Sequence, residues 1–199
     1  AIRCIAIKHL KCDAELAEQY SDAIRKLKIP QVGLSQKNRE MLRQFDDRSL
    51  VKRFLELPDL LWERATKAGF DQQGSLYCQS AIAIEILTFA PMRIANLHNL
   101  HLGRHINWIN GRVHINIPED EVKNREPLHF ILPQHLSDRV KIYINDWRDL
   151  FFASANPFLF PGRNGGPKNS AVLGRQITRY SFKYAGIQIT PHQFRHVAA

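Results

Sequence analysis

Two histidines and an arginine follow a threonine-proline pair near the end of the chain. The stretch reads Thr190-Pro191-His192-Gln193-Phe194-Arg195-His196. Thr190 is a favourable N-cap and Pro191 suits a first turn, so we expect a helix here whose first amides favour an anion. His192 and Arg195 then share one helical face. A proton carrier beside a guanidinium fork suits chemistry on a phosphodiester, whereas an ordinary surface helix with a solvated arginine is the alternative.

Two further basic residues lie where the pattern of elements changes. Arg93 follows residues 76–92, which are nearly apolar all round and predict a central buried helix. A second helical pattern over residues 94–100 starts immediately afterwards, so Arg93 is expected at a junction between two helices. Lys123 is expected near a turn of a small sheet.

That sheet is predicted from residues 104–132. Asn110-Gly111 is a strong hairpin signal, and the residues from 113 to 117 alternate between apolar and polar. A polar turn leads into a third run at residues 127–132. The segment therefore predicts three antiparallel strands with Lys123 near the second turn.

The rest of the chain has mainly helical patterns. Helices are expected over residues 1–29, from Asp46 through Leu57, from Pro58 to about Gly69, from Ser137 to Ala153 and from Ser170 to about Tyr184. Asp46-Asp47-Arg48-Ser49 supplies capping residues for the second of these helices. The core candidates in the fourth of these are Val140, Ile142, Trp147, Leu150 and Phe151. The predicted fold class is α+β, mainly α, with a small three-stranded antiparallel sheet.

The composition indicates a polyanionic partner. The formal charge is +9, from 28 Lys and Arg against 19 Asp and Glu, so nucleic acid is the first candidate and a membrane surface the second. No apolar run is long enough to span a bilayer and no signal peptide is evident, so we expect a soluble, cytoplasmic protein. Cys4, Cys12 and Cys78 support neither a disulfide framework nor a zinc ribbon.

Arg93, Lys123 and His192-x-x-Arg195-His196, in this order on helix, sheet and helix, resemble the tyrosine recombinase family, also called the phage integrase family. The resemblance covers residues 46–199 and implies a helical catalytic domain with a small sheet. It further implies that residues 1–33 are the tail of a helical core-binding domain and that residues 34–45 are a basic linker.

The resemblance also implies roles in strand breakage and rejoining through a covalent phosphotyrosine. Arg93 and Arg195 would clamp the non-bridging oxygens of the phosphate, where charge gathers in the transition state. Lys123 would protonate the departing 5′ oxygen as general acid, and His192 would transfer a proton at the attacking side. This arrangement needs no metal and no other cofactor.

Double-stranded DNA is the partner that the family implies. Lys37, Arg39 and Arg43 of the linker are expected phosphate contacts, together with His196, although a merely solvated linker is the alternative. The full-length protein is expected to act as a homo-tetramer on DNA, associated with the nucleoid, and this stretch alone as a monomer. No membrane is expected to take part.

Two departures from the family pattern stand out. The family usually has an acidic residue three positions after the first arginine, where this chain has Asn96. The family's second His or Trp and its Tyr nucleophile lie downstream of HxxR, whereas Tyr180 and Tyr184 precede it and are expected to be helix residues. We therefore expect a piece of a longer protein that forms no covalent DNA adduct by itself.

Other readings remain open from the sequence. A non-catalytic DNA-binding or regulatory module of the same fold would share the charge, the core and the sheet. His98, His101 and His105 raise the hypothesis of a metal-dependent phosphoesterase, although structural or DNA-facing roles are favoured because no acidic or thiol ligand joins them at a suggestive spacing. The glycines at 162, 165 and 166 are interpreted as a turn and not as a phosphate-binding loop.

Overall fold

The computed structural model describes residues 36–151 and 156–197, and Glu18. The chain divides into two compact units, residues 1–39 and 40–199. The helix expected over residues 1–29 and the side chain of Lys37 lie outside the described part of the chain, as do Cys4 and Cys12.

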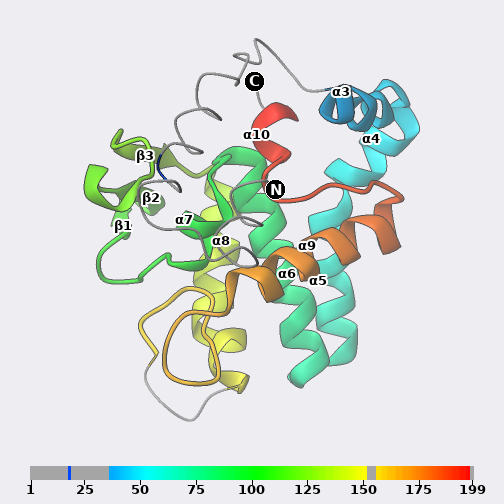
Figure 1. The fold of residues 1–199 in the computed structure, drawn as a ribbon. Helices are drawn as coiled ribbons and strands as arrows, with labels where there is room; N and C mark the ends of the chain where they lie inside the picture. Colours follow the sequence, from blue (N-terminus) through cyan, green and yellow to red (C-terminus); the bar gives the residue numbers. More distant parts are fainter. Residues whose placement is uncertain (1–17, 19–35, 152–155, 198–199) are drawn as a thin grey trace. The chain divides into compact units, whose positions relative to one another are not determined.

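The centre of the second unit is helix α6 (Gln72–Phe89), as the sequence predicted. Asp71 caps its start, where the carboxylate accepts a hydrogen bond of 2.7 Å from the Gly74 amide. Every residue of this helix from Cys78 to Leu87 is buried. Helices α5 (Leu57–Ala68), α8 (Gln134–Ile142) and α9 (Ser170–Tyr180) pack around it (Figure 1).

Burial of α6 includes one charged group. Glu85 is only 4% exposed, and its carboxylate lies 3.0 Å from Arg139 Nη1 and 3.2 Å from His135 Nε2. A buried carboxylate needs such partners because losing water is costly for a charge. No helix in the described ranges combines the length and the apolar character needed to cross a bilayer.

The segment predicted as a linker is helical where it is described. Helix α3 (Gln36–Leu42) is followed by the 3₁₀ turn η1 (Arg43–Asp46). Helix α4 (Arg48–Leu55) then begins with Asp47 as its N-cap, as its sequence suggested. The ring of Phe54 in α4 contacts Phe45 and Phe194, with centroids 5.8 and 5.6 Å away, so this corner of the unit shares an aromatic core with the end of the chain.

The three-stranded sheet is present with the predicted order. It comprises β1 (Ile106–Ile109), β2 (Arg112–Ile117) and β3 (Leu128–Ile131), all antiparallel. Asn110 and Gly111 have φ values of 49° and 77°, which is the left-handed geometry that an Asn-Gly hairpin turn requires. The 3₁₀ turn η2 (Glu119–Glu121) leads from β2 toward Lys123.

The helix expected from Ser137 to Ala153 is less regular than predicted. After α8 the chain forms a π turn, η3 (Tyr143–Trp147), and a 3₁₀ turn, η4 (Arg148–Phe151). A π turn holds more residues than an α turn, so the buried face shifts along the sequence.

The shift changes which side chains enter the core. Ile142 and Leu150 are 42% and 43% exposed, so their prediction as core residues was wrong, and Tyr143 is fully buried instead. Val140 and Trp147 are buried as expected. The side chain of Phe151 lies outside the described part.

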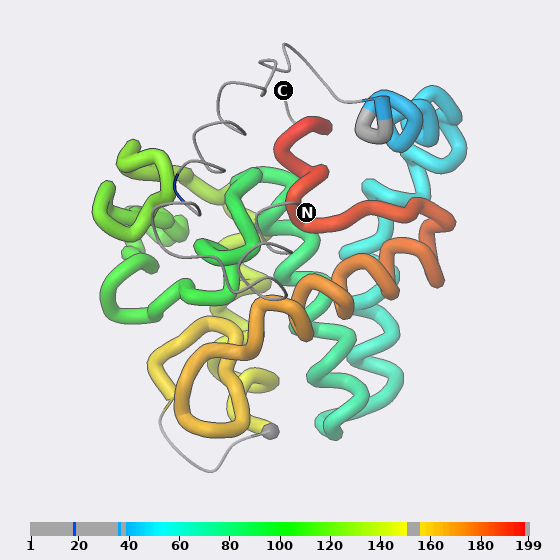
Figure 2. Tube along the Cα trace, viewed as in Figure 1, coloured from blue at the N-terminus to red at the C-terminus, as the bar shows by residue number. Residues whose placement is uncertain are grey.

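The last third of the unit places the end of the chain beside α9. Asn169, and not Ser170, caps α9, because its side chain accepts bonds from the amides of residues 171 and 172. The π turn η5 (Ser181–Ala185) and Gly186, at φ 76°, end this run of helix. The chain then returns along α9 to α10 (Phe194–Val197), as the red tube in Figure 2 shows.

Candidate functional site

Arg93 lies at the junction between α6 and α7 (Ile94–His98), as predicted. Its backbone is extended, with φ −69° and ψ 149°, and its carbonyl accepts bonds from the amides of Asn96 and Leu97 at 2.9 and 3.0 Å. Buried Met92 and Leu97 hold the junction from both sides. The backbone of Arg93 is therefore fixed, while its guanidinium remains partly exposed.

A hydrogen bond joins Arg93 to the turn that carries Lys123. Arg93 Nη1 donates to Asn124 Oδ1 at 3.0 Å, and Asn124 Nδ2 donates to Glu126 at 2.6 Å. The turn is closed by a bond of 2.8 Å from the Arg125 amide to the Val122 carbonyl. Lys123 is exposed and precedes Asn124, so the junction and the turn between β2 and β3 meet at this point.

Asn96, at the position of the usual family carboxylate, is not the partner of Arg93 in this bond. It is 6% exposed, and its side-chain amide donates to the Glu121 carbonyl at 3.4 Å. Asn96 therefore fastens η2, two residues before Lys123, to helix α7. Support for the arginine comes from Asn124, which sequence reasoning missed.

The His192 segment forms a tight turn before α10. Thr190 donates to Gln193 Oε1 through its amide at 2.8 Å and through its hydroxyl at 2.9 Å. The first bond is one half of a capping box. The hydroxyl of Thr190 acts as a donor here, so it does not accept a bond from a helix amide, as the prediction of an N-cap required. The described helix α10 has four residues and starts only at Phe194, so the predicted anion site at a helix start is not supported.

Packing nevertheless fixes the positions of His192 and Arg195. Buried Phe194 lies against Phe54, and Pro191 is buried near Gly174 of α9. His192 is exposed, and its ring meets that of His196 edge to face, with 5.3 Å between the centroids.

Electrostatics connect these residues with Arg93. Partial burial, together with the positive charges of His196, Arg195 and Arg93, lowers the pKa of His192 below its usual value. His192 is thus close enough to both arginines to be affected by their charges. It is mainly neutral at pH 7 and can accept a proton.

Replacing Arg93 by glutamine should raise the pKa of His192, because one of the charges that oppose its protonation is removed. The check is an NMR titration of the His192 ring. Arg163→Gln, a change in an exposed arginine of another loop, should leave that pKa unchanged. An identical titration in wild type and Arg93→Gln would refute the proposed coupling.

The depressed pKa of His192 also affects folding stability. The unfolded chain binds this proton more readily than the folded chain does. His192 therefore lowers the free energy of unfolding as the pH falls through about 6.5.

The predicted DNA contacts are placed unevenly. Arg43 is exposed in η1. Gln44, the next residue of η1, accepts a bond of 2.9 Å from the Gln188 amide and donates one of 3.2 Å to the Gln188 carbonyl. These bonds attach η1 to the segment that leads to His192. His196 lies beside His192. Arg39 is exposed in α3, within the first unit.

Two of the three histidines considered as metal ligands, His101 and His105, have other partners. His105 accepts a bond of 3.1 Å from the His101 amide, and its Nε2 lies 3.1 Å from a Glu121 oxygen. Burial lowers the pKa of His98. Within the described residues, no group of three or more His, Cys, Asp or Glu side chains is arranged to hold a metal ion.

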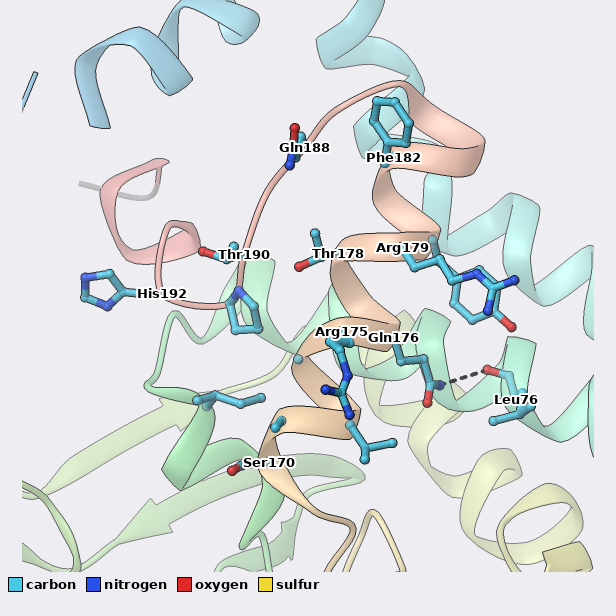
Figure 3. Close-up of a pocket in the computed structure, with 16 residues that line it drawn as sticks. Leu76, Ser170, Arg175, Gln176, Thr178, Arg179, Phe182, Gln188, Thr190 and His192 are labelled. Carbon is cyan, nitrogen blue, oxygen red and sulfur yellow. Dashed lines mark hydrogen bonds between the residues drawn. The ribbon is translucent and has the colours of Figure 1, made fainter. Parts of the chain in front are cut away.

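A groove beside the site was not predicted from the sequence. It has a volume of about 1070 Å³ and runs between α9 and residues 188–192, with His192 among its lining residues (Figure 3). Arg175 and Arg179, one helical turn apart on α9, line it as well. Tyr180 lies in α9 and Tyr184 in η5, as helical residues.

Three solved structures of recombinases are similar to this chain. A XerH site-specific recombinase bound to palindromic difH substrate, in a post-cleavage complex, has a TM-score of 0.55 and 21% identity over 73% of this chain and 37% of the XerH chain. A pre-cleavage XerH complex has a TM-score of 0.55 and 20% identity, covering 74% and 39%. XerA recombinase has a TM-score of 0.50 and 17% identity, covering 99% and 64%. The fold is therefore that of a tyrosine recombinase catalytic domain.

Sequence comparison identifies the family. The profile of the Phage integrase family matches residues 62–199, so the chain belongs to the phage integrase family. Both the family and the fold class predicted from the sequence are confirmed. The chain spans less than two fifths of the length of the XerH chains. No curated protein matches it significantly.

Proposed function

We propose that this chain is the phosphate-activating part of a site-specific DNA recombinase that breaks and rejoins DNA through a covalent phosphotyrosine. Two features support the proposal: the bond from Arg93 to Asn124, which joins the helix junction to the Lys123 turn, and the charges of Arg93 and Arg195 that act on His192. A domain that only binds DNA has no need to bring a neutral histidine and an exposed lysine to one pair of arginines.

Each group has a role that suits its environment. Arg93 and Arg195 hold the non-bridging oxygens of the scissile phosphate by charge-assisted hydrogen bonds. His192, whose pKa is depressed, accepts the proton of the attacking hydroxyl. Lys123 lies on an exposed turn, from which its ammonium protonates the leaving 5′ oxygen.

Double-stranded DNA is the proposed substrate and partner. The net charge of +9 favours a polyanion, and the XerH structures are complexes with DNA. The basic surface around the site is extended by Arg43, His196, Arg175 and Arg179. We also propose Lys37 and Arg39 as phosphate contacts. Tetramer formation on DNA stays a prediction for the whole recombinase.

The test uses the chain together with whatever residues its gene encodes beyond Ala199. A duplex selected from a random pool for binding is nicked near its centre, so that cleavage releases a short strand and traps the intermediate. With EDTA present, we expect a detergent-resistant adduct that mass spectrometry assigns to a phosphotyrosine, and we expect Arg195→Ala to abolish it. Tight DNA binding without any adduct would overturn the enzymatic proposal in favour of a DNA-binding module. A requirement for added metal would instead favour a phosphoesterase.

A further inference from the structure

A second pocket, about 650 Å³ in volume, lies between α6, α9 and the loop of residues 161–169. Lys168 and Arg163 are its charged lining residues, and no Asp or Glu lines the part that the structure describes. The pocket is therefore positively charged. The roles proposed for Arg93, Lys123, His192 and Arg195 do not use it.

Lys168 is held in this pocket by neutral groups. Its Nζ donates to Gln176 Oε1 at 2.5 Å and to Gln79 Oε1. Gln79 is 2% exposed and donates in turn to Tyr143 Oη at 3.1 Å, and Gln176 donates to Ser80 Oγ at 2.7 Å. Both amides are thus fixed with their oxygens toward the amine.

The backbone of Lys168 is fixed as well. Its amide donates to the Phe160 carbonyl at 2.7 Å, which ties the loop to a fully buried residue. No carboxylate within the described residues forms an ion pair with Lys168 that would keep it protonated. Burial lowers the pKa of Lys168 to about 8, so a sizeable share of the amine is neutral near physiological pH.

A neutral lysine amine in a pocket is a nucleophile for carbonyl compounds. We propose that this pocket binds a small aldehyde carrying a phosphate or carboxylate group, and that Lys168 Nζ forms a reversible imine with it. The amine lone pair attacks the carbonyl carbon to form the C–N bond. The carbonyl oxygen then leaves as water with the two amine protons, which gives a neutral imine, and one proton taken up from solvent gives its protonated form. Arg163, exposed at the pocket, supplies a guanidinium for the anionic group.

The probe for this proposal is pyridoxal 5′-phosphate at pH 7.5, with borohydride reduction and peptide mass spectrometry to quantify each lysine separately. We expect Lys168 to be labelled at least about tenfold more than Lys67, an exposed lysine paired with Glu63 at 2.7 Å. Equal labelling of the two would overturn the proposal. Labelling of Lys123, which is exposed in the other site, is quantified separately and does not enter this comparison.

Two variants separate reactivity from folding. Gln176→Glu places a carboxylate beside the amine, keeps it protonated and should reduce labelling of Lys168 to the level of Lys67. Gln72→Glu adds the same charge to the pocket lining at a residue that does not bond Lys168 Nζ, and should retain most of the labelling. Thermal melting of each variant is the measurement that checks whether it is folded. Undiminished labelling in Gln176→Glu would contradict the role given to the neutral amides.

Pyridoxal without its phosphate tests the anionic part of the ligand. We expect at least about tenfold less labelling of Lys168, because the bond to Arg163 is lost. Equal labelling by both aldehydes would overturn the choice of an anionic ligand. The outcome is independent of DNA cleavage, so the proposals for the two sites stand or fall separately.

Discussion

Replacing Arg93 by alanine is expected to lower the rate of DNA strand cleavage by about 100-fold to 1000-fold, the usual cost of removing one preorganised donor to a developing anion. The backbone of Arg93 is held at a helix junction, and its guanidinium bonds Asn124, so the group is oriented before the substrate arrives. DNA affinity should fall only several-fold, because on the proposed DNA-binding surface many other cations would contact the phosphates. The measurement is single-turnover formation of the covalent adduct with the nicked duplex.

Arg93→Lys separates charge from geometry. Lysine keeps the positive charge but cannot bond two oxygens in parallel or reach Asn124 in the same way, so most of the loss should remain. Arg163→Ala, in the other pocket, is the control and should cleave at the wild-type rate. Wild-type cleavage by Arg93→Ala would exclude Arg93 from the reaction centre.

Gly74→Ala is expected to destabilise the fold by about 3 kcal/mol, at the upper end of ordinary overpacking. A Cβ atom at this position would lie 2.1 Å from the Gly69 carbonyl oxygen and 2.8 Å from the Trp147 ring. The first neighbour is backbone at the end of α5, so relief requires moving one helix against another. The melting temperature should fall by roughly 6 to 12 °C for a domain of this size.

Gly166→Ala is the matched control for this prediction. A Cβ atom at Gly166 meets nothing within 4 Å, and its φ is not in the left-handed region. Its melting temperature should stay within about 2 °C of wild type, since surface substitutions rarely exceed about 0.5 kcal/mol. If Gly74→Ala melts at the same temperature as Gly166→Ala, the end of α5 does not approach Gly74 this closely.

Several features were predictable because they depend on short stretches. The apolar run before Arg93 predicted the buried α6, and Asn110-Gly111 predicted the hairpin with its left-handed turn. Asp47 was expected to cap a helix and does so. Such signals depend on periodicity, backbone dihedral preferences and local hydrogen bonds, all of which operate within a few residues. The order of Arg93, Lys123 and the HxxRH stretch was sufficient to indicate the family.

Other features depended on contacts between distant residues. Arg93 and Asn124 are 31 positions apart, and neither neighbourhood indicates that an amide would hold the arginine. At the π turn, Tyr143 occupies the core position that was expected for Ile142. Such irregular helix is favoured by packing and not by the local sequence pattern. Gln176 meets Lys168 and Ser80 only after α9 crosses α6, and the same packing removes the water that would otherwise keep Lys168 charged. The sequence by itself determined the class of elements and the family, whereas tertiary structure decided which polar groups become partners and which amine loses its solvent.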